Sequence, residues 1–328
     1  MPSSAAEPLF ESDDPLEITI EMPLDQIIKD AESKPEVAGF VRFTDTDGSK
    51  VEIAMTMTTR GRSRLAYCFF PPLKINLKKE QTAGTVFEGQ NKLKIVTRCR
   101  DSSTYERYLQ QEFGMYKAYN ELTDYSYRVR WVKVNYIDSL GERKNETHDG
   151  FFIESNNGIS RRLGRERATA NKIPPSQLNP VESNKYEVFQ YLIANTDWSM
   201  IKGPGDEGCC HNGKVLAPTG TDDSFVVLPY DFDQAGLINT KYAIPAQALG
   251  IRSVRKRVYR GRCRHNDTLD ETIALFNEKR DVIERNLVPE DLSDYVKKKS
   301  VKYIDGFYQI VNDPAQRQRQ MAGKCVGS

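Results

Sequence analysis

Apolar and polar residues alternate along much of the first half of the chain, which is the pattern of half-buried β-strands. Strands are expected over residues 16–20, 37–43, 51–57, 69–77, 93–97, 128–137 and 148–154. The turn sequence Asp45-Thr46-Asp47-Gly48 joins two of these strands and favours an antiparallel hairpin. A long helix is predicted over Tyr105 to Leu122, where aromatic and aliphatic residues recur at helical spacing.

After Ser155 the apolar spacing becomes helical. Helices are expected over residues 184–194, 270–286 and 292–311, and the polar tail from Pro314 to Ser328 is expected to fray. These patterns predict an α+β fold with two lobes. The N-lobe, residues 1–155, would hold an antiparallel sheet with the helix at 105–122, and residues 156–328 would form a mainly helical C-lobe.

Composition narrows the class of protein only a little. The chain has 328 residues, of which 38% are hydrophobic and 28% charged, as in an ordinary globular protein. The formal net charge of +1 gives no global electrostatic reason to expect nucleic acid or an anionic membrane as a partner. No apolar run approaches the roughly 20 residues that a membrane span requires. We therefore expect neither a nucleic-acid partner nor a membrane span.

The six cysteines contain no C-x-x-C pair, so a structural zinc site is not expected. Cys68 and Cys99 lie near strand ends, where they could form a disulfide in an oxidising compartment or remain buried thiols. The first residues lack the charged start and apolar core of a signal peptide, yet Ser4-Ala5-Ala6-Glu7 resembles the residues around a cleavage site. This favours a periplasmic or secreted location, with a trimmed signal peptide, over a cytoplasmic one.

The candidate chemistry lies between Asn195 and Asp233. A short apolar run that suits a buried strand ends directly at Asp231 and Asp233, where carboxylates are costly unless they are used. Mg²⁺ needs only one or two carboxylates besides substrate phosphates, so Asn212 with Asp231 or Asp233 would suffice as metal ligands. Asp197 would then receive the proton of an attacking hydroxyl. The alternative is that these are ordinary turn residues.

Other polar residues of the chain are open to two interpretations. His211 has no partner that the sequence identifies, so it is expected to be a structural neighbour of the site. Arg60 and Arg62 flank a glycine in a flexible cationic loop that suits phosphate oxygens, or that is a solvated basic turn. The basic stretch from Arg252 to Arg262 could bind an acidic substrate, or it could be a solvated segment.

The order Asp197, His211-Asn212, Asp231-Phe232-Asp233 resembles the catalytic half of protein-kinase-like folds. The surrounding sequence is most similar to the CotH-type spore-coat kinases and their bacterial relatives. Three further motifs match the same family: Arg60-Gly61-Arg62-Ser63, Leu93-Lys94-Ile95-Val96 and Gly150-Phe151-Phe152-Ile153-Glu154. With these motifs, the resemblance covers most of the chain between about Thr56 and Arg257. A loop rich in Gly and Cys separates Asp197 from Asn212 where kinases have only a few residues, so it must bulge out, at small entropic cost.

The resemblance implies a two-lobed protein-kinase-like fold and a site for ATP and Mg²⁺, with Mn²⁺ as a possible substitute. Such a site uses a strand lysine to hold the α- and β-phosphates, paired with a helix glutamate. Lys74 and Lys94 are both candidates, and position before the helix favours Lys94. Its partner would be Glu112, with Glu106 as the alternative. Glu154 would lie at the hinge between the lobes, beside the adenine.

The leading hypothesis is an ATP- and Mg-dependent atypical kinase that transfers a phosphoryl group to a hydroxyl of a protein or small molecule. One alternative is AMP transfer on the same fold, and another is a catalytically inactive kinase-like binding module. A third is a divalent-metal hydrolase that uses the same carboxylates with water as the nucleophile. The sequence does not identify the acceptor.

Overall fold

The computed structural model describes residues 7–61, 63–205, 207–220 and 223–327. The chain divides into two compact units, and each is described by itself. The first unit comprises the residues up to Leu109 together with Arg128–Arg162, and the second comprises Gln110–Tyr127 together with Leu163–Ser328. The division falls inside a long helix, α4 (Ser103–Asn120).

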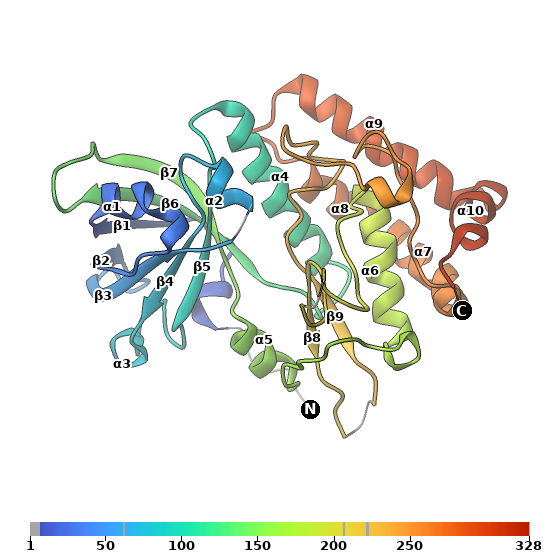
Figure 1. The fold of residues 1–328 in the computed structure, drawn as a ribbon, viewed down its shortest axis with the longest axis horizontal. Helices are drawn as coiled ribbons and strands as arrows, with labels where there is room; N and C mark the ends of the chain where they lie inside the picture. The colour runs from blue at the N-terminus through green and yellow to red at the C-terminus, as the bar shows by residue number, and fades with distance from the viewer. Residues whose placement is uncertain (1–6, 62, 206, 221–222, 328) are drawn as a thin grey trace. The chain divides into compact units, whose positions relative to one another are not determined.

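In the described part of the first unit, seven strands close into a barrel in the order β1-β2-β3-β4-β5-β7-β6 (Figure 1). The strands are β1 (Leu16–Met22), β2 (Val37–Thr44), β3 (Lys50–Thr59), β4 (Leu73–Leu77), β5 (Lys92–Thr97), β6 (Val129–Asp138) and β7 (Glu146–Ile153). The short helices of this unit are η1 (Pro8–Phe10), α1 (Leu24–Lys29), η2 (Ala31–Ser33), α2 (Ser63–Tyr67), α3 (Lys79–Thr82) and α5 (Asn156–Leu163), where η denotes a 3-10 helix. All neighbouring strands in this order are antiparallel except β1 and β6, which are parallel.

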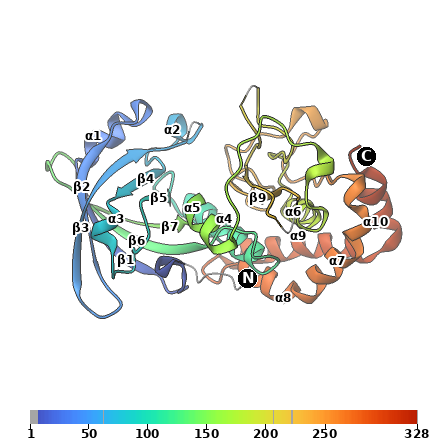
Figure 2. The same cartoon turned by 90° about the horizontal axis from the view of Figure 1, so that it is seen from below.

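Alternation along the strands fills the barrel with apolar side chains. On β4, Leu73, Ile75 and Leu77 are buried, whereas Lys74 and Asn76 between them are partly exposed. Because successive side chains of a strand point to opposite faces, this pattern directs the aliphatic residues inward and the polar ones outward. The same core includes buried side chains of η1 and α1, and Figure 2 shows the strands curving around it.

The prediction of a two-lobed kinase-like fold, whose N-lobe is an antiparallel sheet, is wrong. β1 pairs antiparallel with β2, through Ile18 and Phe43, and parallel with β6, through Ile18 and Val134. This second pairing closes the sheet into a mixed barrel, which removes its edges. Alternation predicted where the strands lie, but it contains no information about the second partner of β1.

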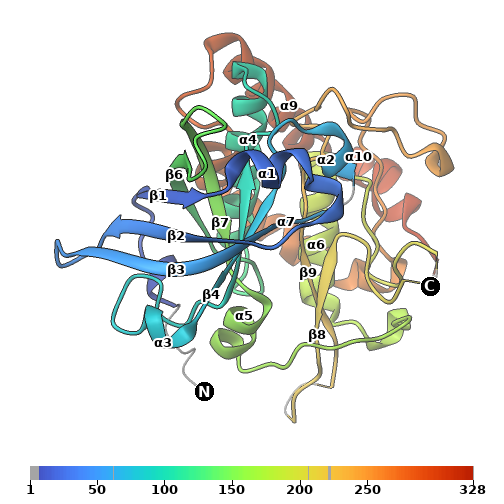
Figure 3. The ribbon, with the colours of Figure 1, turned by 60° about the vertical axis from the view of Figure 1, so that its left-hand side comes forward.

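The second unit combines a long helix, a hairpin and several further helices. Its helices and strands in the described ranges are the C-terminal part of α4, η3 (Pro175–Gln177), α6 (Pro180–Ile193), β8 (Gly213–Leu216), β9 (Val226–Pro229), η4 (Gln247–Leu249), η5 (Cys263–Thr268), α7 (Leu269–Glu278), α8 (Arg280–Leu287), α9 (Asp294–Asn312), α10 (Pro314–Gln320) and η6 (Ala322–Lys324). The antiparallel hairpin β8–β9 lies beside α6 (Figure 3). A cluster that includes Tyr186, Trp198 and Val227 packs between them. No helix within the described ranges has both the length and the apolar run needed to cross a bilayer.

Each of the six cysteines, all of which lie in the described ranges, belongs to a disulfide. The pairs are Cys68–Cys99, Cys209–Cys210 and Cys263–Cys325. The sequence left open whether Cys68 and Cys99 form a disulfide or remain buried thiols, and the structure shows that they form a disulfide. The third pair corrects the prediction of a frayed tail, because the tail contains α10 and is anchored by this disulfide and by a hydrogen bond from the Val326 amide to the Gly261 carbonyl.

A buried ion pair connects the end of the barrel with α5. The Arg162 guanidinium donates to both carboxylate oxygens of Glu154, at 3.1 and 2.9 Å, and the Arg128 amide donates to the same carboxylate. Both side chains are almost fully buried, at 5% and 1% exposure. Breaking such a pair by removing one partner is costly, because an uncompensated charge stays buried.

We therefore expect Arg162→Met to lower the free energy of unfolding of the first unit by about 3–5 kcal/mol, measured from urea denaturation. The double variant Glu154→Gln/Arg162→Met should recover part of this loss, because it leaves no buried charge. The control is Arg42→Met, whose ion pairs with Glu21 and Glu52 are partly exposed and should contribute about 1 kcal/mol or less. Equal losses in Arg162→Met and Arg42→Met would contradict the prediction.

Candidate functional site

The loop that follows α6 presents Asp197. The helix begins at the cap Asn179, whose side chain accepts a hydrogen bond from the Glu182 amide, and it ends at Ala194, whose φ is 52°. The Asn195 side chain then accepts from the Asp197 amide at 2.9 Å, and the Trp198 indole donates to the Asn195 carbonyl at 3.0 Å. These bonds turn the chain sharply after the helix and position the Asp197 backbone.

Arg260 supports the same loop from a distant part of the second unit. Its guanidinium donates to the carbonyls of Thr196 and Trp198, at 2.6 and 2.8 Å, and lies 4.8 Å from the centre of a Trp198 ring. These two carbonyls belong to the residues on either side of Asp197. The loop is therefore held on both sides of the candidate catalytic residue.

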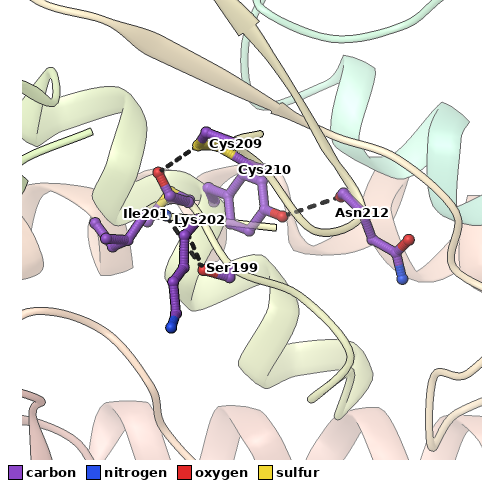
Figure 4. The surroundings of a disulfide bond; sticks show 8 residues. Ser199, Ile201, Lys202, Cys209, Cys210 and Asn212 are labelled. Carbon is purple, nitrogen blue, oxygen red and sulfur yellow. Dashed lines mark hydrogen bonds between the residues drawn. A yellow bond between two sulfur atoms is a disulfide. The ribbon is translucent and has the colours of Figure 1, made fainter. Parts of the chain in front are cut away.

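A backbone bridge returns the chain to Asp197 after the Gly- and Cys-rich loop. Ser199 and His211 exchange both backbone hydrogen bonds, at 3.0 and 3.1 Å, and the loop between them carries the disulfide Cys209–Cys210. Asn212 follows directly. Its amide nitrogen donates to the Asp197 carbonyl at 2.7 Å and to Asp197 Oδ2 at 2.9 Å. Figure 4 shows Asn212 with its side-chain amide pointing away from the disulfide.

The end of β9 brings Asp231 to the same place. The Tyr230 amide donates to the Asn212 carbonyl at 3.1 Å, and the Asp231 amide donates to the Tyr116 hydroxyl at 3.0 Å. Asn212 and Asp231 both have left-handed backbone conformations, with φ of 46° and 64°. Asn and Asp adopt this conformation more readily than other side chains, and it is often found at functional sites.

His211 is the member of the site whose role the sequence did not reveal. Its Nε2 lies 2.7 Å from Asp197 Oδ1. The hydrogen bond to Asp197 raises the pKa of His211 above its ordinary value, and the nearby Asp231 carboxylate acts in the same direction, while burial and Arg260 oppose them. The sequence offered no partner for His211 because Asp197 lies fourteen residues earlier, at no recognisable local spacing.

The arrangement fixes the Asp197 carboxylate without burying it. His211 and Asn212 each bind one of its oxygens, yet the Asp197 side chain is 43% exposed. Such a carboxylate can orient a hydroxyl or water and accept its proton. The Asn212 amide nitrogen faces Asp197, which leaves its Oδ1 as the atom that can ligate a cation.

The remaining predicted residues of the second unit are buried. Asp233 is 7% exposed and its carbonyl accepts from the Thr240 hydroxyl, so its role as a metal ligand stays a prediction. Glu112 on α4 is 5% exposed and adds to the raised pKa of Tyr116, whose main cause is burial. Within the described residues, no group of three or more His, Cys, Asp or Glu side chains could hold a metal ion. Mg²⁺ requires fewer protein ligands than this.

In the first unit, the predicted lysines face each other across two strands. Lys74 on β4 lies directly opposite Lys94 on β5, and both are partly exposed on the outer surface of the barrel. Arg60 follows β3 and its amide donates to the Pro72 carbonyl, whereas Arg62 lies outside the described residues. The ion pair with Arg162 is enough to explain why Glu154 is buried, and no ligand is needed for this. The predicted position of Glu154 beside the adenine stays a prediction.

The predicted partners of Lys94 lie on α4. Glu112 belongs to the second unit, and the alternative, Glu106, lies in the first turn of the helix and belongs to the first unit. The ion pair between a strand lysine and a helix glutamate therefore stays a prediction.

Comparison with known proteins does not assign the chain to a family. No protein-family model matches the chain, and no curated protein matches it significantly. The resemblance to the CotH-type kinases accordingly remains a prediction from the motifs, and the candidate site is interpreted from its own contacts.

The raised pKa of His211 implies that the stability of the fold depends on pH. A group whose folded-state pKa lies above its unfolded value stabilises the fold fully below the unfolded value, here about 6.5, and this contribution is lost as the pH rises through the folded-state pKa. Asp197→Asn removes the main cause of the shift. We expect this variant to lower the His211 pKa and to weaken the loss of stability as the pH rises from about 6.5.

The measurement is an NMR titration of the ring protons, together with urea unfolding at several pH values. The chain has three histidines, and the signal that disappears in His211→Gln identifies this residue. Asp223→Asn, in the exposed segment before β9, is the matched control and should leave the titration unchanged. The same His211 pKa in the native chain and in Asp197→Asn would show that the ion pair does not cause the shift.

Proposed function

We propose that the second unit catalyses an ATP- and Mg-dependent transfer of a phosphoryl group to a hydroxyl of a protein or small molecule. The observation that carries the proposal is the contact between Asn212 and Asp197, made across a long loop and next to Asp231. An Asp that receives the hydroxyl proton, an Asn and a further Asp are the groups that phosphoryl transfer uses in kinase active sites. The proposal depends on these groups and not on the overall fold.

Asp197 would orient the acceptor hydroxyl and accept its proton. Its carboxylate is held in one orientation by His211 and Asn212, so little reorganisation is needed when the acceptor binds. His211, whose pKa is raised by this contact, offsets part of the negative charge of Asp197 and Asp231. The positive charge of His211 lowers the electrostatic cost of placing these two carboxylates close together.

The oxygens of Asn212 and Asp231 fit a magnesium ion. Both are hard ligands, and the orientation of the Asn212 amide directs its nitrogen to Asp197 and keeps its oxygen for a cation. Asp233 would serve as a further ligand or would orient Asp231. The ion, when bound, supplies charge neutralisation at the transferred phosphate.

The lysines and arginines that the sequence suggests for nucleotide phosphates belong to the first unit, and that role stays a prediction. Lys74 and Lys94 lie directly opposite each other on β4 and β5. Arg60 follows β3, and Arg62 lies outside the described residues. AMP transfer, hydrolysis with water as acceptor and nucleotide binding without catalysis remain the alternative outcomes.

We further propose that the protein works in an oxidising compartment, either the periplasm or the extracellular space. The support is the pairing of every cysteine in a disulfide. Structural disulfides persist in such compartments and are rare in the cytosol. Of the residues that resemble a signal cleavage site, Ser4, Ala5 and Ala6 lie outside the described part of the chain.

A thermal shift with ATP and Mg²⁺ tests nucleotide binding. At about one hundred times the dissociation constant, the ligand should stabilise the chain by about 2.7 kcal/mol, and the effect should vanish with a chelator or in Asp231→Ala. Asp197→Asn should keep the shift but reduce self-phosphorylation or phosphate release by about 10²–10⁴-fold, because it loses the proton acceptor and not the metal ligands.

Asp223→Asn serves as the control and should behave as the native chain does in both assays. Mass spectrometry of the incubated protein separates phosphoryl transfer from AMP transfer. Nucleotide that binds without any transfer or hydrolysis would favour the inactive binding module. Absence of any shift at millimolar nucleotide would refute the proposal.

A further inference from the structure

A second candidate site lies in the second unit, in a cavity of about 330 Å³. Residues 198–201 form one side of it, and its walls include the buried side chains of Trp198, Met200 and Tyr259. This volume is at the lower end of the range for small-molecule sites, which are typically apolar with a few placed polar groups. None of the four site residues Asp197, His211, Asn212 and Asp231 lines it.

The first polar group in the wall is Glu187 on α6, which is fully buried. Its Oε1 accepts from the Arg262 amide at 3.1 Å and lies 2.8 Å from His265 Nδ1. Its Oε2 has no hydrogen-bond partner in the described part of the chain. Burial raises the pKa of Glu187, whereas the contacts to His265 and Arg262 favour its ionised form. A buried acceptor without a partner is costly, so a donor from a bound molecule would stabilise it.

The charged groups in the wall other than Glu187 are cations. Within the described residues, neither the Arg262 guanidinium nor the Lys324 ammonium forms a salt bridge, although both line the cavity. Arg260, the third cation, is engaged by the carbonyls of Thr196 and Trp198. Guanidinium and ammonium groups that form no salt bridge within the protein can bind a carboxylate.

Arg262 and Lys324 are carried by segments that are joined covalently. The disulfide Cys263–Cys325 links the residues next to Arg262 and Lys324, and the Val326 amide donates to the Gly261 carbonyl. The backbone segments that carry Arg262 and Lys324 are therefore fixed next to each other before any ligand arrives. Such preorganisation lowers the entropic cost of binding.

We propose that this cavity binds a small carboxylic acid that carries an apolar side chain and an amino or hydroxyl group on its α-carbon. The carboxylate would bind Arg262 and Lys324, and the α-substituent would donate to Glu187 Oε2. The apolar side chain would pack against Trp198 and Tyr259. This binding activity does not depend on the proposed phosphoryl transfer.

Isothermal titration calorimetry on the full chain, without nucleotide, tests the proposal with three probes. L-Phenylalanine carries an α-amino group, 3-phenyllactate an α-hydroxyl group, and 3-phenylpropionate neither. We expect at least one of the first two to bind, and the third to bind at least about tenfold more weakly because it leaves Glu187 without a donor. Comparison of the first two identifies the class of ligand.

Variants place the binding at the cavity. Arg262→Gln and Lys324→Gln should each weaken binding by about tenfold, because each removes a charged partner of the carboxylate. The matched control is Arg264→Gln, an exposed cation on the same turn that does not line the cavity. Circular dichroism verifies folding, and Lys324→Gln decides the test if Arg262→Gln does not fold.

A second readout uses Trp198, one of the two tryptophans in the chain. In Trp131→Phe, ligand binding should change the fluorescence of Trp198. The proposal is overturned if neither phenylalanine nor phenyllactate binds at millimolar concentration, if phenylpropionate binds equally well, or if the native affinity persists in Lys324→Gln. Each of these results leaves the nucleotide assays of the candidate active site unaffected.

Discussion

The antiparallel bridge between Ser199 and His211 is the constraint on which the candidate active site depends. It closes the loop that carries Cys209 and Cys210, so that Asn212 returns to within hydrogen-bond distance of Asp197. Closing a loop of this length costs little entropy, since the cost grows only slowly with length. Once the bridge has formed, the Tyr230 amide connects Asn212 to the end of β9, and Asp231 joins the same cluster.

Buried charges in this protein are held by specific partners. Glu154 and Arg162 form a two-point ion pair at the end of the barrel, and Arg260 is held by backbone carbonyls beside Asp197. Burial lowers the pKa of the Arg260 side chain, because removal from water disfavours its charged form. Glu187 differs from these groups, because one of its two oxygens has no partner in the described part of the chain and it lines a cavity. An incompletely paired buried group is therefore a better indication of a ligand than a fully paired one.

Arg260 connects the two candidate sites of the second unit. It lines the cavity next to Glu187 and also holds the carbonyls on both sides of Asp197. A side chain with both roles needs a fixed position, which its contact with the Trp198 ring helps to provide. The basic stretch of the sequence around Arg260 thus partly supports the Asp197 loop and partly lines the cavity. The sequence alone left a solvated basic segment as an equal alternative.

The sequence by itself determined most of the local structure. Alternation located the strands near 37–44, 50–59 and 129–138, and helical spacing located α4, α6 and α9, because the burial of one face depends only on the order of residues along the element. It also identified Asp197, Asn212 and Asp231, which the fold brings together, although their chemical roles stay proposals. Only the tertiary structure decided that β1 pairs with β6 and closes a barrel, that His211 contacts Asp197, and that Cys325 pairs with Cys263. The physical reason is common to all three: they join residues far apart in the sequence, and the choice among distant partners is made by packing and register, which no local pattern records.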